Sequence, residues 1–200
     1  MADNTIDSSN GSNGSNGSNG SGGSGGSGGF RAGLSGLVVP VPEADPVVGP
    51  WRDRLDPHAQ AGVPAHVTVL FPFLDGSLVD DDVLAALTGE FARHACFDAR
   101  FERCGRFPGL LYLAPTPDAP FRRLTEAVVA RWPHIQPYGG KFGDPAPHLT
   151  LAQGQQDAVL DEAEAALRDA LPVATRVRAV DLVVHDGTAW RHRASFALGT

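Results

Sequence analysis

The ten residues PAHVTVLFPF (64–73) are echoed later in the chain by PHLTLA (147–152), and these two stretches decide the fold that the sequence predicts. Each is a short run of β-branched and aliphatic residues that begins after a proline, which is typical of a buried strand. Each run also opens with the same polar motif, His-x-Thr. We therefore expect two strands of similar construction, one in each half of the chain.

The motif residues are His66 with Thr68 and His148 with Thr150. Successive side chains of a strand point to opposite faces, so each histidine shares a face with its threonine. The aliphatic residues of each run share the other face, which should lie under a helix. Two imidazoles and two hydroxyls would need hydrogen-bond partners inside a core, so we expect all four groups to converge on one cleft instead.

Such a cleft suits phosphodiester chemistry. One neutral imidazole can remove a proton from an attacking oxygen, and a second, protonated imidazole can donate one to the leaving oxygen. Histidine fits both roles because its ordinary pKa lies near ~6.5. His66 and His148 are therefore candidate catalytic residues, and Thr68 and Thr150 are candidate ligands of the substrate phosphate. The competing interpretation is two hydrogen-bonded structural histidines beside ordinary strand threonines.

Periodicity and turn residues place the other elements around these two strands. Strands are expected at 34–41, 65–73, 97–107, 110–114, 148–152, 177–185 and 190–198. Helices are expected at 46–55, 79–95, 118–132 and 158–171. This mixture predicts an α+β fold with antiparallel-rich sheets and helices on the outer faces.

The chain divides into two parts of different composition. Residues 1–29 are mostly Gly, Ser and Asn repeats with little to bury, so they are expected to form a disordered tail or linker, natural or engineered. Residues 30–200 are expected to form one domain, because this length is sufficient for a single hydrophobic core.

Charge and cysteine content limit the function. The net charge of −7 argues against binding to long duplex nucleic acid, which needs many Lys and Arg contacts, but it allows a nucleotide or an RNA terminus. No apolar run is long enough to span a membrane, so no membrane partner is expected. Cys96 and Cys104 fit no metal motif and are expected as free thiols of a cytoplasmic protein. We expect a monomer.

Three longer segments resemble a known family. The paired motifs look like those of the 2H phosphoesterase superfamily. The segments PAHVTVLFPF, GRFPGLLYLAP and YGGKFGDPAPHLTLA resemble its bacterial 2′-5′ RNA ligase-like, or cyclic phosphodiesterase, branch. The resemblance implies a bilobal fold with internal pseudo-two-fold symmetry, a cleft between the lobes, and catalysis without a metal or other cofactor. It also implies action on 2′,3′-cyclic phosphate or 2′,5′-phosphodiester bonds of RNA ends or nucleotides.

Further details concern substrate binding. Some relatives place Arg directly after the second motif, where this chain has Gln153, so a phosphate-binding charge is missing. Tyr138 and Phe142 lie in the Gly-rich loop before that motif and are candidates for stacking on a base, although loop aromatics often only anchor a loop. The remaining histidines, such as His58, show no repeated context and are expected to be structural or exposed.

Two other classes of function remain open. One is a non-catalytic protein that binds a nucleotide or an RNA end, although binding alone does not require two titratable imidazoles. The other is a metal hydrolase with both motif histidines as ligands. No HxxxH, HxH or HD pattern accompanies either motif, and such a site needs further ligands. We therefore expect no metal site.

Overall fold

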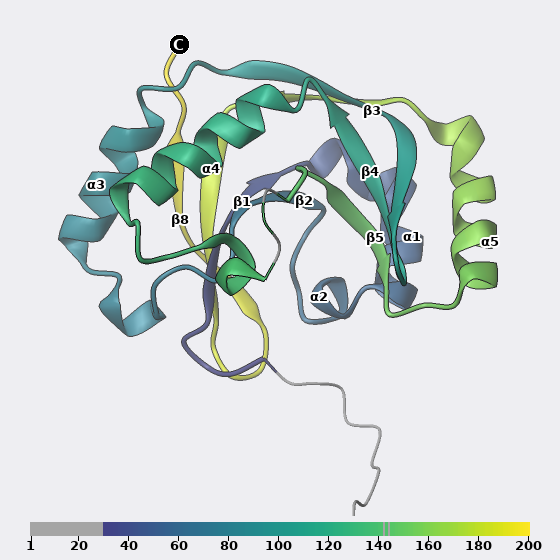
Figure 1. The fold of residues 1–200 in the computed structure, drawn as a ribbon, viewed down its shortest axis with the longest axis horizontal. Coiled ribbons are helices and arrows are strands. Elements are labelled where there is room, and N and C mark those ends of the chain that lie inside the picture. The colour runs from purple at the N-terminus through teal and green to yellow at the C-terminus, as the bar shows by residue number, and fades with distance from the viewer. Residues whose placement is uncertain (1–29, 142, 144) are drawn as a thin grey trace, which may run out of the picture.

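The computed structural model describes residues 30–141, 143 and 145–200. The tail expected at 1–29 and the candidate residue Phe142 lie outside the described residues. The described chain forms two four-stranded antiparallel sheets with helices around them (Figure 1). This confirms the predicted α+β fold class.

Both sheets place a motif strand at one edge. The first has the order β2-β1-β7-β8 and the second the order β5-β4-β3-β6. The first sheet consists of β1 (Ser35–Pro40), β2 (His66–Leu70), β7 (Ala179–His185) and β8 (Trp190–Ala197). The second consists of β3 (Phe97–Phe107), β4 (Leu110–Thr116), β5 (Leu149–Gln153) and β6 (Val173–Val177). The equivalent edge positions of β2 and β5 give the fold its internal pseudo-two-fold symmetry.

Five α-helices pack against these sheets within the described chain. They are α1 (Asp45–Leu55), α2 (Pro57–Gln60), α3 (Asp81–Phe91), α4 (Ala119–Arg131) and α5 (Asp157–Leu167). Short 3₁₀ helices occupy Pro42–Ala44, Gly76–Leu78, Pro137–Gly140 and Arg168–Ala170. The start of α3 is set by Asp80, whose carboxylate accepts a hydrogen bond from the Val83 backbone N–H at 2.9 Å.

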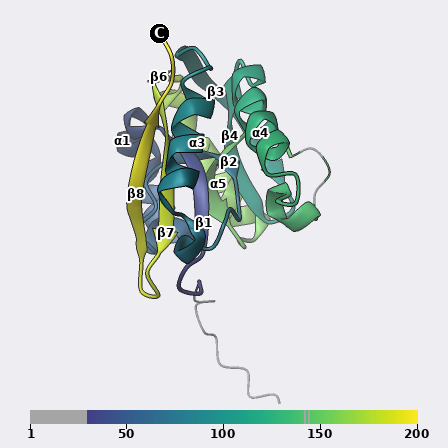
Figure 2. The same ribbon diagram turned by 90° about the vertical axis from the view of Figure 1, so that its left-hand side faces the viewer.

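The apolar faces of the motif strands are buried under helices that come from the opposite lobe. Val67 and Val69 of β2, and Leu149 and Leu151 of β5, are almost fully buried, which confirms the predicted strand phase. Helix α4 packs on β2 and α1 packs on β5, and Figure 2 shows these two helices at opposite sides of the molecule. The Thr125 hydroxyl of α4 donates to the Val69 carbonyl at 2.8 Å. The two lobes therefore hold each other's motif strands in place.

Several elements differ from the sequence prediction. The strand β6 (Val173–Val177) in the second sheet was not predicted, and the strand expected at 177–185 is β7, which begins at Ala179 in the first sheet. Alternation of apolar and polar residues continues through this passage between sheets, so periodicity did not reveal it. The short helix α2 was not predicted, and the helix expected at 79–95 ends at Phe91.

Candidate active site

Both motif histidines and both motif threonines line one cavity of about 1080 Å³ between the two lobes. The cavity is bounded by β2 and β5, which lie next to each other, and by the turn between β3 and β4. The structure thus brings together His66, Thr68, His148 and Thr150, as the strand phase predicted.

The two histidines are held in the same way. The Nδ1 atom of His66 lies 2.8 Å from the Pro64 carbonyl oxygen, and Nδ1 of His148 lies 2.8 Å from the Ala146 carbonyl oxygen. A carbonyl can only accept, so Nδ1 carries the hydrogen in both rings. Each Nε2 is then the basic nitrogen of a neutral imidazole, and it can also carry the proton of an imidazolium. A hydrogen bond from Nδ1 to the carbonyl oxygen two residues earlier therefore orients each ring.

The surroundings of both histidines favour the neutral form. Burial, together with the charge of Arg52, lowers the pKa of His66 to about 4, against the opposing effects of the Pro64 carbonyl and Asp56. Burial also lowers the pKa of His148, against the effect of its hydrogen bond to Ala146. The neutral imidazole is therefore the favoured form of both rings.

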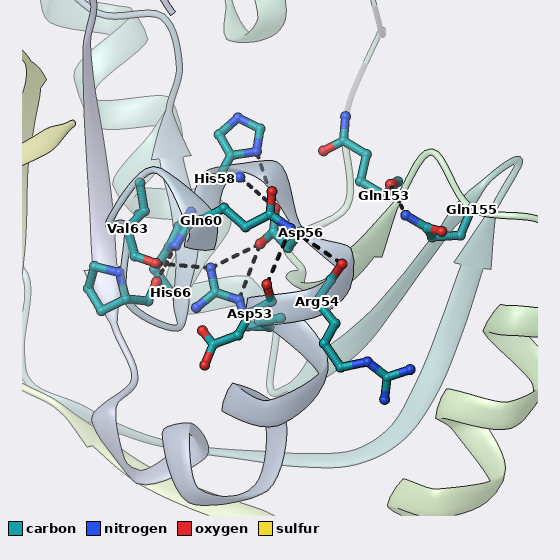
Figure 3. A network of polar contacts seen from close by, with 11 residues as sticks. Asp53, Arg54, Asp56, His58, Gln60, Val63, His66, Gln153 and Gln155 are labelled. Carbon is teal, nitrogen blue, oxygen red and sulfur yellow. Dashed lines mark hydrogen bonds and ion pairs between the residues drawn. The ribbon is translucent and has the colours of Figure 1, made fainter. Parts of the chain in front are cut away.

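A network of charged groups lies next to the segment that holds His66. Asp56 accepts hydrogen bonds from Arg52 Nε at 3.2 Å and Arg52 Nη2 at 3.0 Å, and both side chains are almost fully buried. Arg52 Nη2 also donates to the carbonyl of Val63 at 3.2 Å, one residue before the carbonyl that holds His66. Figure 3 shows Asp56 at the centre of this network, with Val63 and His66 to one side. The role of this pair could not be predicted from the sequence, because an i,i+4 Arg–Asp spacing is ordinary on an exposed helix.

Aromatic rings support His148 instead of charges. The ring of Tyr112 lies 5.4 Å from the His148 ring between centroids, and that of Phe107 lies 5.8 Å away. Phe107 and Tyr112 stack on each other at 4.8 Å. The Tyr112 ring covers Gly105, where a Cβ atom would lie 2.6 Å from the tyrosine oxygen. GRFPGLLYLAP contains all of these residues, but its hairpin pattern did not indicate that they contact a histidine.

Tyr138 lies in the cavity wall and makes contacts within the protein, and its stacking on a base stays a prediction. Its hydroxyl forms a hydrogen bond with Thr68, and burial raises the pKa of that hydroxyl. Its backbone N–H donates to the Phe71 carbonyl at 2.6 Å. Tyr138 has a φ of 52°, a left-handed conformation that is uncommon for a residue with a side chain. These contacts tie the loop that precedes His148 to the end of β2.

The described lining of the cavity contains few charged groups. Gln153 is part of this lining, and no Arg or Lys belongs to it among the described residues. His58 also lines the cavity, although it shows no repeated context in the sequence. Within residues 30–141, 143 and 145–200, no group of three or more His, Cys, Asp or Glu could hold a metal ion. No helix in this part of the chain could cross a membrane.

The sequence matches the profile of the 2′-5′ RNA ligase superfamily over residues 40–189. The chain belongs to this superfamily. Its membership agrees with the resemblance of the paired motifs to those of 2H phosphoesterases. No curated protein sequence matches the chain.

Solved structures with the same fold include two of E. coli LigT. The complex of LigT with 3′-AMP has a TM-score of 0.55 and 17% identity, over 85% of this chain and 100% of that chain. The complex with NADP+ has a TM-score of 0.53 and 17% identity, over 86% and 100%. A structure described as a phosphoesterase has a TM-score of 0.55 and 15% identity, over 85% and 100%. At these identities the likeness establishes the fold.

Proposed function

We propose that this protein cleaves or forms 2′,3′-cyclic phosphate or 2′,5′-phosphodiester bonds of RNA ends or nucleotides by metal-independent, two-histidine acid–base catalysis. The observation that carries the proposal is the equivalent hydrogen bond that Nδ1 of His66 and Nδ1 of His148 each form with a backbone carbonyl. These bonds leave one Nε2 from each motif strand available in one cavity. Displacement at phosphorus requires a proton to be removed on one side and delivered on the other. LigT has been solved with 3′-AMP, ATP and NADP+, which supports a nucleotide as the substrate.

In the hydrolytic direction, a neutral imidazole removes a proton from water while the water oxygen forms a bond to phosphorus. The bond from phosphorus to one ribose oxygen breaks, and the protonated imidazole donates its proton to that oxygen. The product is a phosphomonoester beside a free ribose hydroxyl. In ligation, a hydroxyl of a second nucleotide takes the place of water. The same imidazole removes its proton as its oxygen bonds to phosphorus, and the protonated imidazole again donates to the ribose oxygen whose bond to phosphorus breaks.

We assign the base role to His66 and the acid role to His148 in hydrolysis. The pKa of His66 is about 4 in the unliganded protein, so its ring is neutral and able to accept a proton over the physiological range. Among the described residues, none places a buried cation beside His148 as Arg52 does beside His66, and a negatively charged phosphate bound beside His148 favours its imidazolium form. The different groups around His66 and His148 thus favour the base role for one ring and the acid role for the other, although the two rings are otherwise equivalent.

The hydroxyls of Thr68 and Thr150 share the cavity with the two rings and would donate hydrogen bonds to the non-bridging oxygens of the phosphate. Tyr138 bonds to Thr68 and so limits the orientations of that hydroxyl. The unpaired thiols of Cys96 and Cys104 further support a reducing, cytoplasmic location.

The test is hydrolysis of a panel of 2′,3′-cyclic nucleotides in excess chelator, with the position of the product phosphate determined. His66→Ala and His148→Ala should each lower turnover by about 10²–10⁴-fold. The double variant should lose less than the product of the two single losses, because the residues act as a unit. Thr68→Val should lower turnover less than either histidine variant, because it removes one hydrogen bond.

The matched control is His134→Ala, which removes an exposed histidine outside the cavity lining and should leave turnover unchanged. Loss of wild-type activity in chelator would contradict the metal-independent mechanism. Full activity in either motif variant would contradict the two-histidine mechanism. Tight nucleotide binding without any turnover would indicate the non-catalytic binding protein instead.

A further inference from the structure

His58 is a third histidine of the cavity that the two-histidine reaction does not use. Its Nδ1 lies 3.4 Å from Asp56 Oδ1, and its backbone N–H donates to the same oxygen at 3.0 Å. Its ring lies 4.8 Å from the Phe30 ring and 6.4 Å from the Phe71 ring between centroids. Because these contacts orient the ring with Nδ1 toward Asp56, Nε2 is the nitrogen available to a ligand. The side chain is 30% exposed, so a ligand can reach it.

The carboxylate behind His58 has a fixed position. Arg52 donates two hydrogen bonds to the other oxygen of Asp56, and the pair is buried. Burial alone would raise the pKa of Asp56, but the hydrogen bond from His58 and the charge of Arg52 lower it overall, so the carboxylate is ionised. In Figure 3, Asp56 lies between His58 and the residues around His66. A single buried ion pair therefore supports both His58 and His66.

The described cavity lining offers an anionic substrate few positive groups. Apart from Tyr138, the ionisable side chains in this lining are Asp56, His58, His66 and His148. Lys and Arg are missing from it among the described residues, and Gln153 in this lining is uncharged. Charge for binding phosphate must therefore come largely from protonated imidazoles. The reacting phosphate occupies His66 and His148, which leaves His58 for a different group.

We propose that His58 binds a second phosphate group of the substrate, so that the cavity favours nucleotides that carry a phosphate besides the one that reacts. The proposal rests on the proposed function, because it assigns His66 and His148 to the reacting phosphate. A protonated Nε2–H donates a charge-assisted hydrogen bond to a phosphate oxygen, while Asp56 accepts from Nδ1–H on the other side of the ring.

The test is calorimetric binding of a nucleoside 3′,5′-bisphosphate and the corresponding 3′-monophosphate at pH 6. The full-length wild-type protein should bind the bisphosphate about ten- to a hundredfold more tightly than the monophosphate, the range expected for one charged hydrogen bond. His58→Gln should remove most of this preference. His58→Lys should keep the preference, because an ammonium group can donate to the same phosphate.

The matched control is His192→Gln, because His192 lies 3.8 Å from a carboxylate, that of Asp181, but is exposed and outside the cavity lining. It should keep the wild-type preference. Equal binding of the two ligands by the wild-type protein, or an unchanged preference in His58→Gln, would overturn the proposal. Neither result depends on turnover. Failure to hydrolyse any 2′,3′-cyclic nucleotide would instead overturn the proposed function.

Discussion

Replacement of His66 by glutamine should make the protein less sensitive to acid. The imidazole of His66 is neutral in the folded protein because burial and Arg52 lower its pKa to about 4. Glutamine has a similar size and can still donate to the Pro64 carbonyl, but it does not titrate. The substitution therefore isolates the contribution of His66 protonation to stability.

The magnitude follows from the two pKa values of this side chain. In the unfolded chain the pKa is near ~6.5, so the unfolded state binds a proton more readily than the folded state. The contribution of His66 is fully present above pH ~6.5 and is lost as the pH falls toward 4. At pH 4.5 the wild-type protein should have lost about 2.5 kcal/mol of stability through this one residue, relative to pH 7.5.

The assay is urea unfolding of both proteins at pH 7.5 and pH 4.5 in a buffer without phosphate. Protonation of carboxylates also lowers stability over this range, but it does so in both proteins and cancels in the comparison. The decrease from pH 7.5 to 4.5 should be smaller in His66→Gln by about 2.5 kcal/mol. His134→Gln, which removes an exposed imidazole, serves as the control.

Equal pH dependence of His66→Gln and the wild-type protein would refute this reasoning. It would mean that the His66 ring is as well solvated in the folded protein as in the unfolded chain. The assignment of His66 as the neutral base would then lose its physical basis, even if the variant were inactive.

Three further outcomes are expected. The pH optimum of kcat/KM should lie below about 6.5, because the pKa values of His66 and His148 are both lowered and the free enzyme needs one of these two imidazoles protonated; an optimum above pH 8 would contradict this. Arg52→Met should lower the free energy of unfolding, measured by urea titration, by about 3–5 kcal/mol, because it leaves the buried Asp56 carboxylate unpaired. Addition of Asp56→Leu to this variant should restore part of the loss. Gly105→Ala should cost about 1–3 kcal/mol and also lower turnover, because its Cβ displaces the Tyr112 ring from His148. A fully stable and active Gly105→Ala protein would show that this packing is not required.

Local rules explain why part of the site could be predicted. The two-residue period of a strand puts each histidine beside its threonine, and it puts Val67 and Leu149 on the buried face. The bond from each Nδ1 to the carbonyl two residues earlier is equally local. Both features depend only on neighbouring residues, so they are the same in the two lobes.

Differences between the lobes depend on contacts that are distant in the sequence. Arg52 and Asp56 form an ordinary helical pair by spacing, and only packing of the chain around them makes them a buried support for His66. The same is true of His58, which reaches the cavity because Asp56 holds it there. Tyr112 contacts His148 across the pairing of β4 with β5. Such long-range contacts cannot be inferred from a sequence pattern.

The sequence by itself determined the composition of two amphipathic strands, the α+β class and the pairing of an imidazole with a hydroxyl on each strand, because these follow from short-range periodicity. Only the tertiary structure decided that α4 covers β2 while α1 covers β5, and that the chain changes sheets between Val177 and Ala179. It also decided which imidazole has a buried cation behind it. An apolar face of a strand must be covered by another element. The hydrophobic effect is non-directional, so the face alone does not determine which element covers it. The choice is made by the packing of the whole chain.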